Sequence, residues 1–261
     1  MSKNWKGELT AHLQELHLPA MRWGWEDIAQ RAEQETLGYG QYLHELATQE
    51  CGARRKNRIE RLRRESGLPL EKTLSNFNLK RLPQKAARQV KTLLDGVFLD
   101  RKENVLVFGN PGAGKSHLLC AMGHELILAG RRVSFTTCAL LVQDLLKAKR
   151  ELRLSRFIKQ LAKHDGLIID EMGYVQQSRE EMEVLFTLLA ERYERGSVLL
   201  TSNLPFSKWE GIFKDPMTTA AAIDRLVHHS IIIELNIPSY RVEQAKKQQA
   251  APAEQKEGGV S

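Results

Sequence analysis

The chain has 261 residues and a formal net charge of +7, with a sequence pI of about 9.3. This length accommodates one large α/β domain with a small additional domain, and the basic charge is compatible with an anionic partner. Three cysteines without Cys-x-x-Cys spacing argue against a disulfide framework or a zinc site, and no apolar run is long enough to span a bilayer. We therefore expect a cytoplasmic protein that makes no membrane contact.

The first 66 residues have the pattern of a small helical domain. Leu9, Leu13 and Leu16 repeat at helical spacing, and Pro19 ends the repeat. Further helices are predicted over 27–37 and 39–64. Residues 67–84, which begin with Gly-Leu-Pro, are predicted to link this domain to the next.

The last predicted helix of this domain ends in a strongly basic run. Only Glu60 opposes its seven cations, which are Arg54, Arg55, Lys56, Arg58, Arg61, Arg63 and Arg64. Charge runs are usually solvated helix faces, but this run is almost unopposed, and flexible arginines suit phosphate contacts that do not depend on sequence. We interpret the run as a contact with nucleic acid.

Between residues 85 and 243, apolar strands alternate with helices. The predicted strands cover 105–108, 132–136, 167–171, 197–203 and 231–235. This alternation predicts a three-layer α/β fold, a parallel sheet with helices on both faces. Residues 244–261 form a low-complexity tail that we predict to be disordered.

A glycine-rich loop joins the first predicted strand to the helix predicted over 115–129. It consists of Gly109, Asn110, Pro111, Gly112, Ala113, Gly114, Lys115 and Ser116, followed by His117. This spacing is that of a P-loop, in which backbone N–H groups turn toward phosphate oxygens at a helix N-terminus. Lys115 can reach the β- and γ-phosphates, and the Ser116 hydroxyl can bind Mg²⁺. Because strand and helix flank the loop as required, we favour an ATP site over a chance match.

Two acids end the strand predicted over 167–171. Asp170 is placed to hold Mg²⁺ through water, and Glu171 is placed to activate an attacking water. The alternative is a strand that simply ends in charged turn residues. The P-loop upstream favours the functional interpretation, and the second acid suggests hydrolysis in addition to binding.

Two polar residues further along the chain fit the same site. Asn203 follows a buried strand at the sheet edge where open α/β folds bind ligands, although an Asx-turn residue would look the same. Arg225 is either a surface helix residue or a group that reaches the nucleotide of a neighbouring subunit. His228 and His229 are adjacent and would face different ways on a helix, so we predict no metal site besides that for Mg²⁺.

The segment 138–164 is predicted to be one long helix with a second basic patch. Lys149, Arg153, Arg156 and Lys163 share one of its faces at helical spacing. A solvated helix face is again the alternative. Two separate patches make a polyanionic partner more plausible than either patch alone.

The motifs 109–116, 167–171, 199–203 and 224–225 follow the order found in AAA+ ATPases. The stretch 201–209, Thr-Ser-Asn-Leu-Pro-Phe-Ser-Lys-Trp, and the stretch 224–229, Asp-Arg-Leu-Val-His-His, closely resemble the IstB family of helper ATPases. These accompany the IstA transposase of bacterial insertion sequences, and the resemblance covers nearly the whole chain. More distantly, the domain resembles the helicase loader DnaC and the initiator DnaA.

The resemblance implies an oligomer that assembles on duplex DNA, captures target DNA and stimulates an IstA-type transposase, with ATP between neighbouring subunits. It implies that Glu171 is the catalytic base, Asn203 the sensor that positions water, and Arg225 an arginine finger acting in trans. Arg241 resembles a second sensor that contacts the γ-phosphate. Two features depart from the pattern: the turn 76–79 replaces the usual Phe-Asp-Phe, and no separate C-terminal lid domain is expected.

Three other functions remain open at this point. A DnaC-like helicase loader would have the same ATPase core and a different client. A P-loop kinase for small molecules would normally carry an acceptor-binding lid. A DNA-coating scaffold would use ATP only as a structural ligand.

Overall fold

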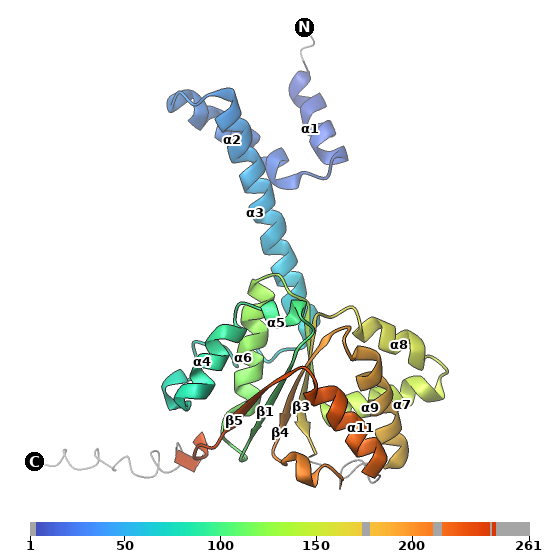
Figure 1. Cartoon of the computed structure of the whole chain (residues 1–261). Coiled ribbons are helices and arrows are strands. Elements are labelled where there is room, and N and C mark those ends of the chain that lie inside the picture. The colour runs from blue at the N-terminus through green and yellow to red at the C-terminus, as the bar shows by residue number, and fades with distance from the viewer. Residues whose placement is uncertain (1–3, 174–177, 211–215, 241, 244–261) are drawn as a thin grey trace, which may run out of the picture. The chain divides into compact units, whose positions relative to one another are not determined.

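The chain folds as two units, residues 1–61 and 62–261 (Figure 1). The computed structural model describes residues 4–173, 178–210, 216–240 and 242–243. Arg241 and the predicted tail 244–261 lie outside the described residues. The division falls inside a helix, five residues before the boundary expected at residue 66, and Leu62, the first residue of the second unit, is buried.

Helices form the first unit, as predicted. They are α1 (Trp5–Glu15), α2 (Pro19–Gln34) and the greater part of α3 (Tyr39–Ser66). Pro19 ends the leucine repeat because it is the first residue of α2, where its missing N–H costs nothing. A small core of Trp25, Ile28 and Leu46 holds the three helices together.

Glu50 is the polar centre of this unit. Its carboxylate is only 3% exposed and accepts hydrogen bonds from the backbone amides of Ala20 (2.8 Å) and Met21 (3.2 Å) at the start of α2. Arg54 donates to the same carboxylate at 2.8 Å and to the carbonyl of His17 at 2.6 Å. Arg54 therefore has a structural role, which the sequence interpretation did not assign to it.

We predict that Glu50→Gln destabilises the first unit by about 1–3 kcal/mol at neutral pH, because buried donors lose a charged acceptor. Burial alone would raise the pKa of Glu50, but the hydrogen bonds from Arg54, Met21 and Ala20 outweigh it and lower the pKa below its ordinary 4.5. A lowered pKa means that the stabilisation is present above the unfolded-state pKa and is lost as the pH falls through the folded-state value.

Urea unfolding at pH 7 and below pH 4.5 measures this effect. Tryptophan fluorescence suits it, since Trp5, Trp23 and Trp25 all belong to the first unit. The difference between wild type and Glu50→Gln is expected to shrink on acidification. Glu33→Gln, an exposed change on α2, is the matched control. An equal difference at both pH values would contradict this role for Glu50.

A five-stranded parallel sheet forms the centre of the second unit, in the order β2-β3-β4-β1-β5. Its strands are β1 (Asn104–Gly109), β2 (Val133–Thr137), β3 (Gly166–Met172), β4 (Ser197–Ser202) and β5 (Ser230–Leu235). Strands β1, β3 and β4 lie inside the sheet and are apolar along most of their length, as expected of parallel strands covered on both faces.

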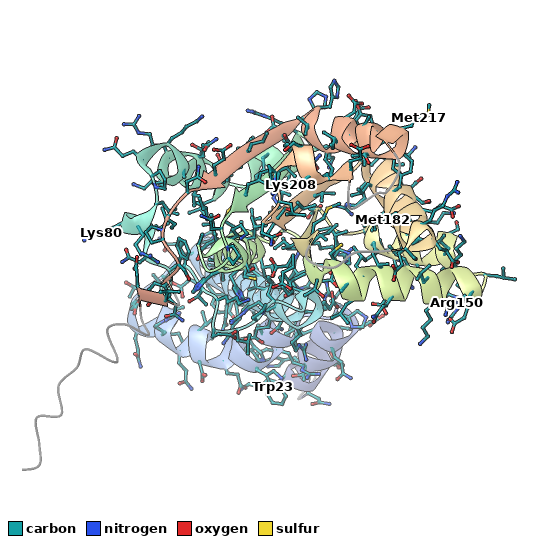
Figure 2. All side chains as sticks on the ribbon, turned by 90° about the horizontal axis from the view of Figure 1, so that it is seen from below. Trp23, Lys80, Arg150, Met182, Lys208 and Met217 are labelled. Carbon is teal, nitrogen blue, oxygen red and sulfur yellow. The ribbon has the colours of Figure 1, made fainter. Side chains whose placement is uncertain are left out.

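Helices cover both faces of this sheet, so the predicted three-layer α/β fold is confirmed (Figure 1). On one side lie α4 (Gln84–Leu93), α5 (Val97–Asp100) and α6 (Lys115–Leu128). On the other lie α7 (Cys138–Arg150), α8 (Leu154–Leu161), α9 (Arg179–Arg192) and α11 (Pro216–Val227). Figure 2 shows Met182 inside this second layer, where it is 2% exposed, and Arg150 at the outer end of α7. In the described part of the chain, no helix combines the length and apolar character that crossing a membrane requires.

The segment 138–164 is two helices, so the prediction of one continuous helix was wrong. The backbone turns at Leu152, whose φ is +56°. The amide of Leu152 donates to the carbonyl of Lys149 and that of Arg153 to the carbonyl of Ala148, the hydrogen bonds of a Schellman end. Glycine normally occupies this left-handed position, so its absence concealed the break. The four cations therefore do not share one helical face.

The predicted linker 67–84 packs onto the second unit. Leu68 and Leu82 are buried, and the segment includes a short 3₁₀ turn at Leu79–Arg81. Two histidine rings of α6 hold it: His117 Nε2 lies 3.0 Å from the Thr73 carbonyl, and His124 Nε2 lies 3.0 Å from that of Pro69. The segment thereby becomes a wall beside the P-loop.

Candidate nucleotide site

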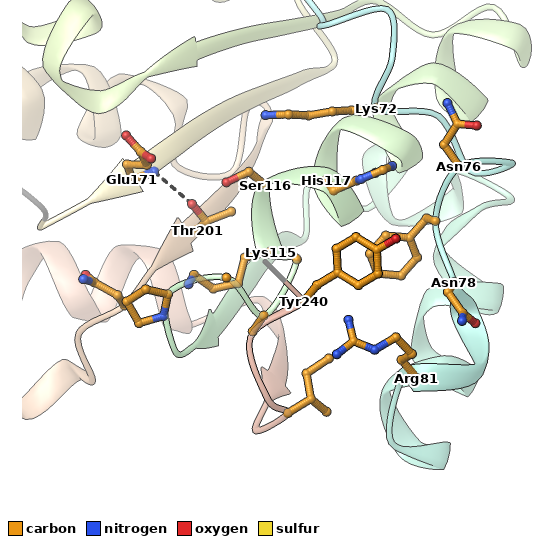
Figure 3. Close-up of a pocket in the computed structure, with 17 residues that line it drawn as sticks. Lys72, Asn76, Asn78, Arg81, Lys115, Ser116, His117, Glu171, Thr201 and Tyr240 are labelled. Carbon is orange, nitrogen blue, oxygen red and sulfur yellow. Dashed lines mark hydrogen bonds between the residues drawn. The ribbon is translucent and has the colours of Figure 1, made fainter. Parts of the chain in front are cut away.

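A cavity of about 390 Å³ opens at the carboxyl edge of the sheet (Figure 3). Its walls come from the P-loop, from the ends of β3 and β4, and from the segments 72–81 and 237–240. The residues that line it are Lys72, Asn76, Phe77, Asn78, Arg81, Pro111, Gly112, Ala113, Gly114, Lys115, Ser116, His117, Glu171, Thr201, Asn203, Ile237 and Tyr240.

The P-loop has the backbone that its glycines predict. Gly112 and Gly114 have φ values of +79° and +93°, in the left-handed region that residues with a side chain avoid. A Cβ on Gly112 would lie 2.0 Å from the Ser239 hydroxyl oxygen, and Tyr240 N donates to the Gly112 carbonyl at 3.0 Å. The chain after β5 therefore rests directly on the loop.

Lys115 and Ser116 begin α6 at the floor of this cavity. Lys115 Nζ donates to the carbonyls of Gly109 (2.8 Å) and Asn110 (3.0 Å), so the ammonium is held inside the loop. Figure 3 shows the Ser116 hydroxyl on the same side of the cavity as Thr201 and Glu171. Positive charge, helix N-terminus and loop amides together make this floor suited to phosphate groups.

A bulge in β3 separates the two acids that end the strand predicted over 167–171. The register of β3 against β4 shifts between Ile169 and Met172, and Glu171 has a φ of +63°. As a result Asp170 is 4% exposed, whereas Glu171 is exposed and lines the cavity. A non-glycine residue in this conformation costs about 1–3 kcal/mol, and such residues are found at functional sites as well as at helix ends such as Leu152.

Thr201 on β4 holds this arrangement together, and sequence reasoning did not identify it. Its hydroxyl donates to Asp170 Oδ1 at 2.5 Å and accepts from the Glu171 amide at 2.9 Å. The available signal was a polar residue in the otherwise apolar run 198–201. One side chain thus fixes both acids, so that a buried carboxylate and an exposed one occupy adjacent positions.

The residues at this end of the cavity fit Mg²⁺. Ser116 offers a hydroxyl and Glu171 a carboxylate from the lining, and the buried carboxylate of Asp170 is hydrogen-bonded to Thr201 next to them. Oxygen ligands of this kind are those that Mg²⁺ takes in phosphate-binding sites. Mg²⁺ also retains several waters, so the buried Asp170 can act on it through water.

The segment 72–81 supplies a second group of lining residues that sequence reasoning missed. Figure 3 shows the Lys72 side chain extending toward the side of Ser116 and Glu171, while Arg81 and Tyr240 lie at the opposite end. The Phe77 ring packs against His117 with centroids 5.2 Å apart, and the Arg81 guanidinium lies 5.0 Å from the Tyr240 ring centroid. Aromatic surfaces suit a nucleobase, so the cavity has one end suited to phosphates and an aromatic end suited to a base.

Two other predicted residues differ in their placement. Asn203 lines the cavity next to Thr201. Arg225 is not among the described residues that line it: its Nη1 donates to the Ala221 carbonyl at 2.9 Å, and its guanidinium stacks 4.8 Å from the Phe186 ring centroid. Arg241, which the resemblance also assigned to the site, lies outside the described residues.

None of the candidate DNA contacts is among the described residues that line this cavity. All seven cations of the run 54–64 are exposed. In the second patch, Lys149 pairs with Glu183 at 3.2 Å and Arg153 pairs with Glu151, so acids on the same domain reduce its positive charge. Arg54 in the run on α3 pairs with Glu50 in the same way, but this run has seven cations against one acid and is the stronger candidate.

A family model described as IstB-like ATP binding protein matches residues 11–249. An insertion sequence ATP-binding protein of Sinorhizobium fredii, by its name, is 42% identical over 245 residues, which cover 92% of this chain and 82% of that protein. The corresponding protein of insertion sequence IS5376 from Geobacillus stearothermophilus is 36% identical over 250 residues, covering 96% of this chain and all of that protein.

The fold is also similar to a solved structure. AMPPCP-bound DnaA from Aquifex aeolicus superposes with a TM-score of 0.56 at 19% identity, covering 74% of this chain and 58% of that chain. This likeness supports the AAA+ fold. The match across nearly the whole sequence goes further: this chain belongs to the family of IstB-like ATP binding proteins.

Proposed function

We propose that this protein is an AAA+ ATPase that binds duplex DNA as a homo-oligomer, captures and remodels target DNA, and stimulates an IstA-type transposase. One observation carries the enzymatic part: a single cavity joins the P-loop to the Asp170–Thr201–Glu171 arrangement and to Asn203. The names of the relatives refer to insertion sequences, which supports a transposase as the partner protein.

In this proposal each residue of the cavity has a separate task during ATP hydrolysis. The amides of the P-loop and the ammonium of Lys115 bind the phosphates. Ser116 and Asp170 would hold Mg²⁺, which would neutralise charge that develops on the phosphate oxygens. Asn203 orients a water molecule in line with the γ-phosphorus. Glu171 accepts a proton from this water while the water oxygen attacks the γ-phosphorus. The bond from this phosphorus to the ADP oxygen breaks, and ADP and phosphate leave. Phe77 and Tyr240 flank the adenine.

The position of Arg225 supports a site shared between subunits. Its guanidinium lies on α11, outside the cavity of its own chain. An arginine that serves catalysis from there must reach a neighbouring copy. ATP then bridges two subunits, and nucleotide binding controls how the oligomer holds DNA.

Competitive capture distinguishes this function from helicase loading. The tagged full chain, bound to ATP and duplex DNA, is offered the transposase encoded beside it and the replicative helicase of the same cell. We expect the transposase to be retained and the helicase to be lost in the wash. Retention of the helicase alone would overturn the proposed client and favour a loader.

DNA binding through α3 makes a quantitative prediction. Replacing Arg55, Lys56 and Arg63 by Gln is expected to weaken duplex binding equally for unrelated sequences. It is expected to reduce the slope of log K against log[salt] by about 0.9 for each phosphate that the variant no longer neutralises. Arg54 is left unchanged because it pairs with Glu50. Fluorescence anisotropy over a salt series measures both quantities.

The chain offers a matched control on another exposed basic helix. Lys85, Arg88 and Lys91 on α4 are exposed and have no assigned role in DNA binding. Replacing them by Gln lowers the net charge by the same amount. We expect this control to keep most of the salt slope, and equal reductions in both triple variants would contradict a specific role for α3.

A further inference from the structure

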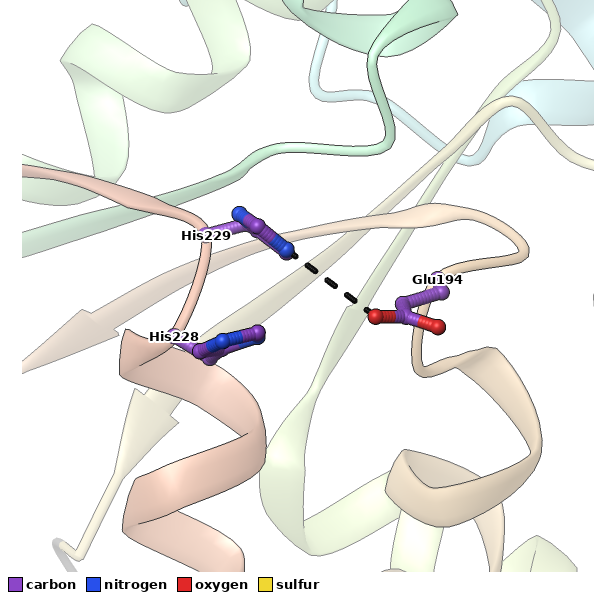
Figure 4. Close-up of side chains that lie close together, drawn as sticks. All are labelled: Glu194, His228 and His229. Carbon is purple, nitrogen blue, oxygen red and sulfur yellow. Dashed lines mark ion pairs between the residues drawn. The ribbon is translucent and has the colours of Figure 1, made fainter.

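Three side chains with metal-binding atoms meet at the sheet edge opposite the P-loop: Glu194, His228 and His229 (Figure 4). Glu194 lies in the turn between α9 and β4, and the histidines lie between α11 and β5. One ligand atom from each lies within 4.8 Å of the other two, and His229 Nε2 is 3.9 Å from Glu194 Oε1. All three side chains are exposed, so an ion in solution can reach them.

The sequence-based expectation that the two histidines face different ways was wrong, because α11 ends at Val227. Both rings therefore belong to the turn before β5, and their centroids lie 4.1 Å apart. The turn is anchored at both residues: His228 N donates to the Asp224 carbonyl at 2.9 Å, and Asn104 N donates to the His229 carbonyl at 2.7 Å.

The groups around these ligands resemble the surroundings of a metal site. The Tyr193 hydroxyl lies 2.8 Å from His228 Nδ1, and metal-bound histidines commonly keep such a partner on the nitrogen that does not bind the metal. With the proton on Nδ1, Nε2 of His228 has its lone pair available. Glu194 has a φ of +58°, an uncommon conformation for a residue with a side chain, and its carboxylate faces His229.

We propose that Glu194, His228 and His229 form a binding site for Zn²⁺, with water in the fourth position. Two imidazoles and a carboxylate are a donor set that zinc takes with tetrahedral geometry, whereas Mg²⁺ favours oxygen ligands alone. Bonds of about 2.0–2.1 Å place tetrahedral ligand atoms roughly 3.3 Å apart. The present separations, at most 4.8 Å, exceed this value by up to about 1.5 Å, a difference that rotation of the exposed side chains can remove.

This site is separate from the nucleotide cavity. In a parallel sheet, the residues before β4 and β5 lie at the amino edge, and the P-loop follows the carboxyl end of β1. A bound ion joins the α9–β4 turn to the α11–β5 turn. Zinc and nucleotide therefore bind independently, and neither requires the other.

The test is a zinc titration of the full chain against a chromophoric chelator. The protein carries Cys51→Ser, which removes the exposed thiol, and the buffer contains excess Mg²⁺ to occupy oxygen sites. We expect one Zn²⁺ per chain. His228→Ala, His229→Ala and Glu194→Gln are each expected to weaken binding by about tenfold or more, and Tyr193→Phe by about tenfold because a ligand then lacks its hydrogen-bond partner.

Two controls locate the ion. His12→Ala removes an exposed histidine of the first unit, and Glu171→Gln removes a carboxylate that lines the nucleotide cavity; both are expected to keep the full zinc affinity. The proposal is overturned if the wild type binds no zinc in this competition. It is equally overturned if all three ligand variants bind as tightly as the wild type, or if Glu171→Gln alone loses the ion.

Discussion

Glu171→Gln is expected to lower the rate of ATP hydrolysis by about 10²–10⁴-fold and to leave the affinities for ATP and duplex DNA close to wild type. An amide of the same shape cannot accept the proton of the attacking water, and a positioned general base contributes a factor of this size. The phosphate-binding groups of the P-loop are untouched by the change. Steady-state phosphate release gives the rate, and equilibrium binding of a fluorescent ATP analogue gives the affinity.

The hydrogen bonds around Glu171 indicate that this substitution changes the side chain without changing the backbone. Thr201 is bonded to the Glu171 backbone amide and not to its side chain, so the bulge is expected to keep its conformation. Glu180→Gln, an exposed change on α9, controls for the loss of one negative charge. Unchanged turnover in Glu171→Gln would refute its role as the base, and would favour a scaffold that holds ATP without hydrolysing it.

The floor of the cavity could be predicted because its chemistry is local in sequence. Gly109 to Ser116 are consecutive, and their spacing alone fixes a loop, a helix start and a cation. Asp170 and Glu171 are likewise adjacent, and their strand is apolar up to that point. The sheet and its two helical layers follow from the same alternation of short apolar runs and amphipathic segments.

The aromatic end of the cavity could not be predicted because it depends on contacts between distant segments. Phe77 and Tyr240 are more than 160 residues apart in sequence and line one cavity only because each segment packs beside the P-loop. A segment rich in polar and turn residues was interpreted as a linker, although its buried leucines and the two histidines of α6 hold it in place.

Two helix ends were predicted wrongly, and each error has a physical cause in the residues at that helix end. Leu152 takes a left-handed conformation that a search for glycine does not detect, and it is 95% exposed, so no apolar packing marks it either. The end of α11 at Val227 carries no proline or glycine. In both places the helix end is set by backbone hydrogen bonds, which sequence patterns describe poorly.

Arg225→Ala is expected to reduce ATP turnover by roughly 10³-fold or more, the usual effect of losing an arginine finger, with ATP affinity little changed. The reason is that the guanidinium stabilises charge that develops only in the transition state of a neighbour's site. Thermal unfolding serves as the folding control, since the change also removes the stacking on Phe186. Arg225→Ala with full activity would argue against a shared site.

Mixing two inactive variants decides whether this arginine acts in trans. Lys115→Ala lacks the phosphate-binding ammonium but keeps Arg225, and Arg225→Ala has the opposite defect. In a random equimolar oligomer, about a quarter of the interfaces pair an intact Lys115 with an intact Arg225 from the next subunit. Turnover should therefore recover to about a quarter of wild type when the two are mixed with DNA. If the mixture stays as inactive as its components, Arg225 serves its own chain, and the nucleotide is not shared between subunits.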